Sequence, residues 1–318
     1  MWWVPTGPLT KFPLHAAGYH DGRSSNTVVD RVISSYSSSV KAILFNRRRR
    51  ETVPTSSTVS LKPQPKALLV AMPTTPEQSP LSFAAEEVHI LHAICASVGL
   101  KPVTPRRRKA DVLPHLAQCH IFHFSGHGRS SRLDPAQSAL LLEDWRRDRL
   151  TVASLLALNL ASAANRQPFL AYLSACSTGQ VKDGKAWDES IHLVGACQLA
   201  GFRHVVGTLW EVDDELCVDM ARGVYETMRD RGMTDEAVGL GLHRAARQAR
   251  DRWVASSGMA RRGGDVPAEG GRLHELGEGV SSLELAGSRG EAGSSRNISA
   301  LEGDEARLYW VPYVHFGV

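Results

Sequence analysis

The feature that most constrains the fold is residues 119–179, which contain two short apolar runs, each ending in a small-residue turn that carries a reactive side chain. The first run, residues 121–128, reads IFHFSGHG, and the second, residues 169–179, reads FLAYLSACSTG. Both are short, rich in β-branched or aromatic residues and closed by Gly and Ser, as is typical of buried strands. Because buried parallel strands deliver their C-terminal ends to one edge of an α/β sheet, we expect His127 and Cys176 to lie side by side there.

Around this stretch the pattern alternates between strands and helices, which predicts a mainly parallel sheet flanked by helices. Further strands are expected at residues 67–72, 138–143, 204–210 and 308–316, and helices at 81–98, 109–118, 151–160, 190–200, 213–231 and 234–255. The first of these helices carries apolar residues at helical spacing and stops at Gly99, a common C-terminal cap.

The N-terminal part is expected to contain strands of its own. Strands are expected at residues 2–4 and 28–36, and a short helix at residues 39–47. A strand that starts at residue 2 would need a covering partner before it. We therefore expect the chain to be the C-terminal part of a longer protein, or the product of a shortened gene model.

Shifts in composition divide the chain. Residues 1–46 are the N-terminal part of the domain, and 47–65, rich in Arg, Ser, Thr and Pro, are expected to be a linker or exposed loop. The main core spans 66–256. Residues 257–304 are rich in Gly, Ser and Glu and are predicted to be a disordered insertion, after which 305–318 supply a terminal strand of the core.

Composition narrows the class of protein. The chain is 42% hydrophobic and 22% charged, as in ordinary soluble globular proteins, and its net charge of +4 is too small to demand a nucleic-acid partner. Its five cysteines are odd in number and form no CxxC pair, which favours free thiols in a reducing, cytoplasmic compartment. The sequence contains neither a run of about 20 apolar residues nor a signal-peptide pattern, so we expect no membrane association.

His127 and Cys176 together suggest nucleophilic catalysis. A thiol attacks as its thiolate, and a neighbouring imidazole can take its proton and later protonate the leaving amine. The interval between them is 49 residues, and caspases place their His about 50 residues before the Cys, although that signature does not transfer between families by itself. The sequence thus predicts a cysteine endopeptidase acting on a protein or peptide, with no cofactor and no metal.

Several blocks in order resemble the CHAT domain, a member of the caspase and separase group of cysteine peptidases. The two middle blocks, HFSGHG at residues 123–128 and LSACSTG at 173–179, are specific matches. The closing blocks GTLWEVDD (207–214) and WVPYVHFG (310–317) also match, whereas the opening residues 2–9 and 13–18 are only suggestive. The resemblance implies a caspase-like fold, and the frequent occurrence of tetratricopeptide repeats before such domains implies upstream repeats or a regulatory protein as partners.

The remaining site residues follow from position or from the resemblance. The N–H groups of Gly128 and Cys176 are candidates for the oxyanion donors, because both lie at tight strand ends. By resemblance to separase, the segment after Trp210 would line the pocket for the residue before the cleaved bond. The acidic residues Asp213 and Asp214 there would favour a basic residue, although acids at a helix N-terminus are an equally good explanation for either one.

Simpler interpretations stay open. Cys176 could be a buried inert thiol, and the fold could serve as a catalytically silent interaction module or an unrelated flavodoxin-like ligand binder. A zinc site is disfavoured, because strand alternation places Cys119, His123 and His127 on one face but spreads the first and last by about 26 Å. The basic runs at residues 47–50 and 106–109 have no interleaved aromatics, so solvated charge explains them better than nucleic-acid binding.

Overall fold

One mixed sheet organises the molecule. The computed structural model describes residues 1–20, 26–51, 64–129, 131, 133–160, 168–176, 193–209, 212–256 and 310–318. In this part of the chain ten strands form a single sheet, whose main path runs β1-β2-β10-β9-β8-β5-β3-β4. Its central parallel block consists of β3 (Lys66–Ala71), β4 (Lys101–Val103), β5 (Ile121–Arg129), β8 (Leu170–Cys176) and β9 (His204–Thr208). The predicted mainly parallel sheet is confirmed.

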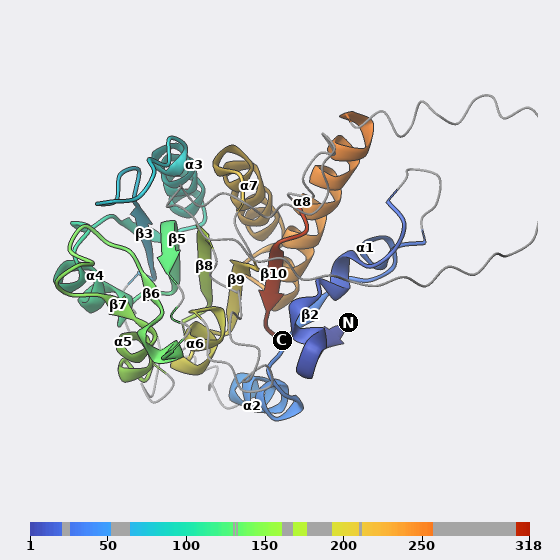
Figure 1. Cartoon of the computed structure of the whole chain (residues 1–318), viewed down its shortest axis with the longest axis horizontal. Helices are drawn as coiled ribbons and strands as arrows, with labels where there is room; N and C mark the ends of the chain where they lie inside the picture. Colours follow the sequence, from blue (N-terminus) through green and yellow to red (C-terminus); the bar gives the residue numbers. More distant parts are fainter. Residues whose placement is uncertain are drawn as a thin grey trace, which may run out of the picture.

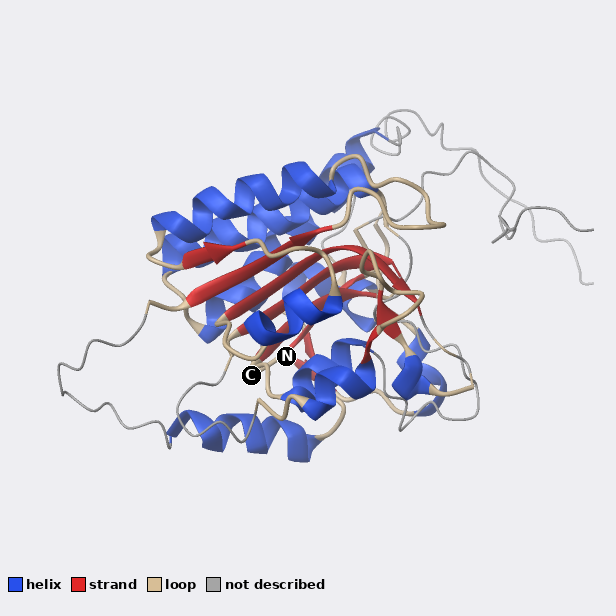
Figure 2. Cartoon of the chain, turned by 90° about the vertical axis from the view of Figure 1, so that its left-hand side faces the viewer, coloured by secondary structure: helices blue, strands red, loops and turns tan. Residues whose placement is uncertain are grey.

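Helices cover both faces of this sheet (Figures 1 and 2). On one face lie α3 (Ala84–Ser97), α7 (Asp214–Arg231) and α8 (Asp235–Ser256). The opposite face packs against α4 (Lys109–Leu116), α5 (Val152–Ala157) and α6 (Leu193–Ala200). The central strands β3, β5, β8 and β9 are therefore buried on both sides, which explains why they read as nearly continuous apolar runs.

Side-chain alternation along the strands assigns residues to these two layers. On β8, Leu170 and Tyr172 contribute to the cluster beneath α3 and α7, whereas Ala171 and Leu173 join the cluster beneath α4, α5 and α6. Successive strand residues point to opposite faces, so the same alternation continues to the strand end. The position of a residue along β5 or β8 therefore determines which of the two helical layers it faces.

Most of the expected helices form, with shifts of a few residues. Gly99 has φ of +77°, as its C-terminal capping role requires, and Thr151 caps α5 by accepting from the Ser154 N–H in a capping box. The strand expected at 138–143 is only β6 (Ala139–Leu140), which pairs antiparallel with β5 and with β7 (Leu150–Thr151).

The N-terminal part extends the sheet instead of packing on it. The strand β1 (Trp2–Trp3) pairs with β2 (Ser35–Tyr36), which in turn lies beside β10 (Tyr313–Phe316). The covering partner of the first strand thus follows it in the chain. The premise that a partner must precede it is wrong.

One strand prediction in this region is also wrong. Residues 28–36 were expected to be extended, but Val28–Arg31 form the helix α1, and only Ser35–Tyr36 are strand. Thr27 explains the difference, because its side chain accepts a hydrogen bond from the Asp30 N–H and so caps a helical turn. This local capping prevails over the β-branched character of the Val28-Val29 pair.

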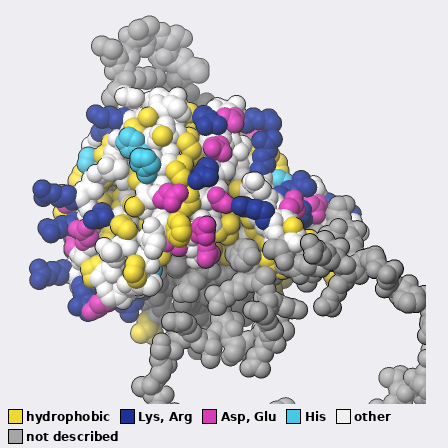
Figure 3. All heavy atoms as spheres, turned by 90° about the horizontal axis from the view of Figure 1, so that it is seen from above, with side chains coloured by type: hydrophobic (Ala, Val, Ile, Leu, Met, Phe, Trp, Pro, Cys, Tyr) yellow, Lys and Arg dark blue, Asp and Glu magenta, His cyan; other side chains and the backbone are white. Residues whose placement is uncertain are grey.

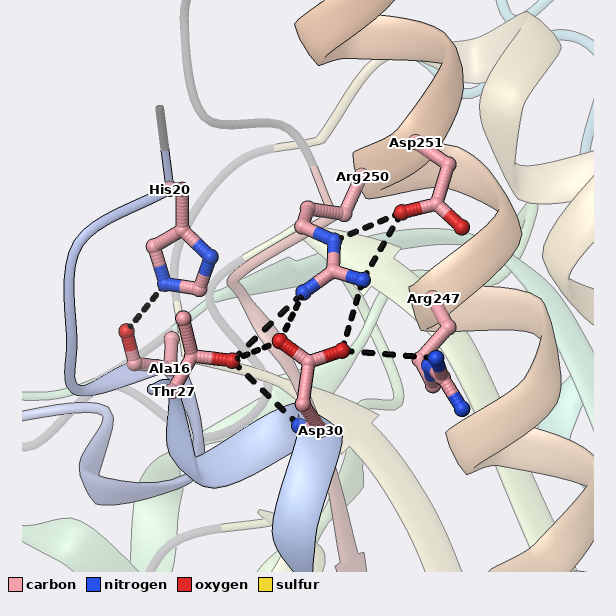
Figure 4. A network of polar contacts seen from close by, with 7 residues as sticks. All are labelled: Ala16, His20, Thr27, Asp30, Arg247, Arg250 and Asp251. Atoms are coloured by element: carbon pink, nitrogen blue, oxygen red, sulfur yellow. Dashed lines mark hydrogen bonds and ion pairs between the residues drawn. The ribbon is translucent and has the colours of Figure 1, made fainter. Parts of the chain in front are cut away.

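A buried ion pair fastens α1 to α8 (Figure 4). The Arg250 guanidinium donates to both oxygens of Asp30, at 2.8 and 2.9 Å, and both side chains are about nine-tenths buried. Arg247 lies 3.3 Å from the same carboxylate, and the Thr27 hydroxyl also donates to it. These contacts, together with desolvation that acts in the opposite direction, leave the pKa of Asp30 lowered to about 2, with the Arg250 hydrogen bond as the main cause.

The domain limits were expected at residue 47 for a linker and at 257 for an insertion. The helix α2 (Val40–Glu51) runs past the first limit, and residues 52–63 lie outside those that the structure describes. Residues 257–304 also lie outside them, so the expected insertion stays a prediction.

The surface over α3, α7 and α8 carries basic and acidic side chains interspersed (Figure 3). In the basic run at 106–109, basic side chains also lie beside acidic ones. Arg107 pairs with Glu143 at 2.8 Å and Lys109 with Asp148 at 2.7 Å. None of the described helices combines the length and apolar character needed to cross a bilayer.

Candidate active site

His127 lies near the C-terminal end of β5, and the strand continues through it to Arg129. The sequence had suggested a turn at this point, but Gly126, His127 and Gly128 are all extended. The His127 side chain is only 8% exposed, and its Nε2 lies 2.8 Å from the carbonyl oxygen of Ser79. A carbonyl oxygen can only accept, so Nε2 carries a proton and Nδ1 is the ring nitrogen left to bind or release the second one.

Ser79 belongs to the loop that joins β3 to α3, and this loop is held from several sides. The Leu81 N–H donates to the Pro73 carbonyl, and the Trp145 indole donates to the Pro76 carbonyl. A backbone carbonyl has no signature in the sequence, so this partner of His127 could not be predicted.

Cys176 is the last residue of β8 and is the backbone pairing partner of His127. Paired strands lie about 4.8 Å apart, and parallel neighbours in register share a face of the sheet. By alternation, position 176 belongs to the same face as Ser174 and Tyr172. The expectation that the two positions meet at one edge of the sheet is met at the level of the backbone; the Cys176 side chain and residues 177–192 lie outside the described residues.

Gly128 is half-buried in β5 and faces Leu140 of β6 across the antiparallel pair. In the same pairing the Leu141 N–H donates to the His127 carbonyl at 2.9 Å. The backbone around the candidate oxyanion donor is thus fixed by a second sheet partner, and its proposed role stays a prediction.

The two acidic residues at the start of α7 both have structural partners. Asp213 is the N-cap, and its Oδ1 accepts from the N–H groups of Glu215 and Leu216 at 3.1 Å. Asp214 reaches across to α3, where its Oδ2 accepts from the Phe83 N–H at 2.8 Å. Partial burial raises the pKa of Asp214, and nearby His127 opposes this rise through its charge. Residue 211, the first of the segment expected to line the same pocket, lies outside the described part of the chain, as does residue 210.

Beneath these residues is a buried polar network that the sequence analysis missed. The Glu87 side chain on α3 is 1% exposed, and its Oε2 accepts from the hydroxyls of Ser125 at 2.7 Å and Ser174 at 3.1 Å. Its Oε1 lies 3.0 Å from His123 Nε2, and His123 Nδ1 lies 3.2 Å from the Tyr225 hydroxyl. A signal was available, because Glu87 occupies a core position at helical spacing between Ala84 and Leu91.

The other four cysteines, all among the described residues, are buried and form no disulfide. Burial raises the pKa of Cys95 and of Cys197 to about 12, and that of Cys119 further still. Thiols of this kind are inert as nucleophiles, because the thiolate is the reactive form.

The expected alignment of Cys119 with His123 and His127 is wrong. Cys119 precedes β5 and packs beneath α4, α5 and α6, where its thiol donates to the Leu116 carbonyl at 3.3 Å. His123, by contrast, faces α3 and α7. Among the residues that the structure describes, no group of three or more His, Cys, Asp or Glu is arranged to hold a metal ion.

A mainly parallel sheet with helices on both faces, and a His and a Cys position paired at two neighbouring strand ends, define the chain as an α/β protein. The family model that matches is the CHAT domain, over residues 1–318, and the chain belongs to this family. No curated protein matches the chain in sequence.

Solved structures with a similar fold are distant in sequence. A structure described as a protease is 12% identical, with 96% of this chain and 57% of that chain covered and a TM-score of 0.51. The Saccharomyces cerevisiae separase–securin complex is 12% identical over 97% of this chain and 15% of that chain, with a TM-score of 0.49. The Arg-specific cysteine proteinase gingipain R is 10% identical, covering 74% of this chain and 53% of that one, with a TM-score of 0.46. The chain therefore spans well under two thirds of the length of each.

Proposed function

We propose that the chain is a cysteine endopeptidase in which Cys176 is the nucleophile and His127 the general acid and base. The observation that supports this most strongly is the pairing of His127 with Cys176 across neighbouring parallel strands, together with the hydrogen bond from His127 Nε2–H to the Ser79 carbonyl. That hydrogen bond orients the ring and leaves Nδ1 as the basic atom.

The proposed reaction starts with transfer of the Cys176 thiol proton to His127 Nδ1. The thiolate attacks the substrate carbonyl, and the N–H groups of Gly128 and Cys176 donate to the oxyanion that forms. As the C–N bond breaks, Nδ1–H protonates the departing amine, and water then hydrolyses the thioester with His127 again acting as base. The Ser79 carbonyl stabilises the imidazolium that exists between these steps, because it accepts from Nε2–H.

We further propose that the substrate is a protein or peptide with a basic residue before the cleaved bond. Asp214 supports this choice, since it lies within electrostatic range of His127 and is partly buried. Asp213 would add to the negative potential at the same rim, although its carboxylate also caps α7.

The test uses the purified chain, a thiol-reactive peptide probe and a peptide set varied at the residue before the cleaved bond. We expect site-resolved labelling at Cys176 that is lost in Cys176→Ala, and a turnover about 10²- to 10⁴-fold lower in His127→Ala. A preference for Arg or Lys supports the acidic pocket, and a preference for Asp refutes it.

The matched control is Cys197→Ala, which removes a thiol that is buried elsewhere in the fold. It should leave labelling and turnover unchanged. Labelling spread evenly over all five cysteines, without cleavage of any peptide, would instead assign the chain as an interaction module.

A further inference from the structure

A single carboxylate oxygen connects the two strands on which the candidate dyad lies. Ser125 precedes His127 by two residues on β5, and Ser174 precedes Cys176 by two residues on β8. Both serine hydroxyls donate to the same oxygen, Glu87 Oε2, at 2.7 and 3.1 Å. Since two residues of strand span about 7 Å, the carboxylate lies one pair of residues below the dyad and on the same face.

The rest of the network orients Glu87. Because a carboxylate accepts, His123 Nε2–H donates to Oε1, and His123 Nδ1 then accepts from the Tyr225 hydroxyl. The His123 ring also stacks on Tyr172 of β8, with centroids 4.9 Å apart and planes 20° from parallel. Four elements, α3, α7, β5 and β8, are thus joined through side chains at two successive residue pairs of the sheet.

This network would be an unfavourable way to stabilise the fold alone, because it buries a carboxylate. Glu87, at 1% exposed, is the most deeply buried acidic side chain among the described residues, and an apolar residue at this position of α3 would avoid the cost of desolvating a carboxylate. The backbone ladder alone already holds β5 and β8 in register. The added side-chain contacts lie at Ser125 and Ser174, one residue pair before the ladder ends at His127 and Cys176.

We propose that Glu87 is a positioning residue of the candidate site, which through Ser125 and Ser174 holds the ends of β5 and β8 so that His127 and Cys176 stay in contact distance. This inference rests on the proposed function. Glu87 does not touch the substrate in this account; it acts on the geometry of the two residues that do.

The geometry predicts different outcomes for two substitutions of Glu87. In Glu87→Gln the amide oxygen can accept from both serines, while the amide N–H donates to His123 Nε2 if that ring moves its proton to Nδ1 and donates to Tyr225. In Glu87→Leu both serine hydroxyls lose their acceptor. Glutamine should therefore rescue what leucine loses.

The first measurement is amide hydrogen exchange of peptides that cover 121–129 and 170–176 in the folded chain. Glu87→Leu, and the double variant Ser125→Ala with Ser174→Ala, should exchange about tenfold faster at these strand ends, while Glu87→Gln should match the wild type. The double variant keeps the Glu87–His123 hydrogen bond, so it is informative even if Glu87→Leu does not fold. Matched controls on α3 are the exposed Glu86→Gln and Ser97→Ala, which should change nothing in these peptides.

The second measurement is the pH dependence of Cys176 alkylation by iodoacetamide, resolved by mass spectrometry, with His127→Ala as reference. A thiolate that depends on the imidazole stays reactive below the usual thiol pKa of about 8.5, and His127→Ala should remove that reactivity. Glu87→Leu and the double serine variant should lower the rate at pH 6 about three- to tenfold toward that of His127→Ala, and Glu87→Gln should not.

The outcomes separate the two proposals. If wild type and His127→Ala give the same profile, the dyad itself fails, whatever the Glu87 variants do. If the dyad stands but exchange at the strand ends is unchanged in the leucine and double serine variants, the positioning role is overturned. Faster exchange with an unchanged Cys176 profile would also overturn it, and would leave Glu87 with a purely structural role.

Discussion

At the scale of single residues, the candidate site combines groups that serve the fold with groups that serve chemistry. Asp214 is the clearest case, because one oxygen accepts from the Phe83 N–H at the start of α3 while the carboxylate lies within electrostatic range of His127. The sequence left both explanations open, and the structure adds a defined partner for the structural one. The two roles differ in what they require: a cap needs an acceptor, and attraction of a basic substrate needs a charge.

Substitution of Asp214 can therefore separate the roles. Asp214→Ala should lower the free energy of unfolding by about 1 kcal/mol, since the Phe83 N–H loses its acceptor, whereas Asp214→Asn should cost less. Both should weaken any preference for Arg or Lys before the cleaved bond by the same factor, because both remove the charge. Chemical denaturation and the peptide set measure the two effects; an unchanged preference in both variants would leave Asp214 with the cap alone.

At the scale of elements, β5 contributes residues to both helical layers and to the candidate site. Its odd-numbered residues His123, Ser125 and His127 face α3 and α7, whereas Phe122 and Phe124 are buried beneath α4, α5 and α6. The strand stays extended through the small residues that the sequence suggested would form a turn. Its further pairing with β6 supplies the reason, because Gly128 and Arg129 gain partners there.

Gly126 tests how tightly this strand is packed. A Cβ at this position would lie 2.7 Å from the Phe124 ring and 3.0 Å from the Met72 side chain. Gly126→Ala should therefore destabilise the fold by about 1–3 kcal/mol through overpacking, and shift the adjacent His127.

Gly99→Ala is a useful comparison, because a Cβ there meets no atom within 4 Å although φ is positive. It should cost stability without affecting Cys176 labelling, whereas Gly126→Ala should reduce both. Denaturation curves and the labelling assay together measure this. Equal effects on labelling in the two variants would show that packing at Gly126 is unrelated to the site.

At the scale of the whole molecule, the two ends of the chain are joined to the core through buried histidines. His15 lies between the Tyr36 hydroxyl at 2.8 Å and the Val311 carbonyl at 2.9 Å. His315 on β10 lies between the Ser35 hydroxyl, 2.8 Å from its Nδ1, and His204, 3.0 Å from its Nε2; His204 in turn bonds Asp235 at the start of α8. Burial lowers the pKa of His15 to about 4 and also lowers those of His204 and His315.

These shifts predict that stability falls with acid. The unfolded chain takes up protons on its histidines near pH 6.5, whereas folded His15 does so only near pH 4, so the stabilisation is complete above pH 6.5 and is lost as the pH falls toward 4. For His15 alone the loss is about 3 kcal/mol. His15→Gln, which can donate to Val311 and accept from Tyr36, should flatten the pH dependence of the free energy of unfolding in this window.

The control is His92→Gln, on the exposed side of α3. It should leave the pH dependence as it is in the wild type. Acid loss of the Asp30–Arg250 pair falls below this window, because its stabilisation is lost between the ordinary Asp pKa of 3.8 and the lowered value of about 2. A His15→Gln curve parallel to that of the wild type would contradict the assignment.

The sequence by itself determined the parallel core, the two strands that end near His127 and Cys176, and most helix positions. Burial on both faces and helical spacing each produce a recognisable pattern of apolar residues that are close together in the chain. It could not determine that Val28–Arg31 turn into a helix, that the first strand pairs with residues 35 and 36, or that Cys119 leaves the His127 face. Nor could it predict that His127 bonds the Ser79 carbonyl, or that Glu87 accepts from two serines. These are contacts between segments far apart in the chain, and only the folded backbone brings them within hydrogen-bond distance.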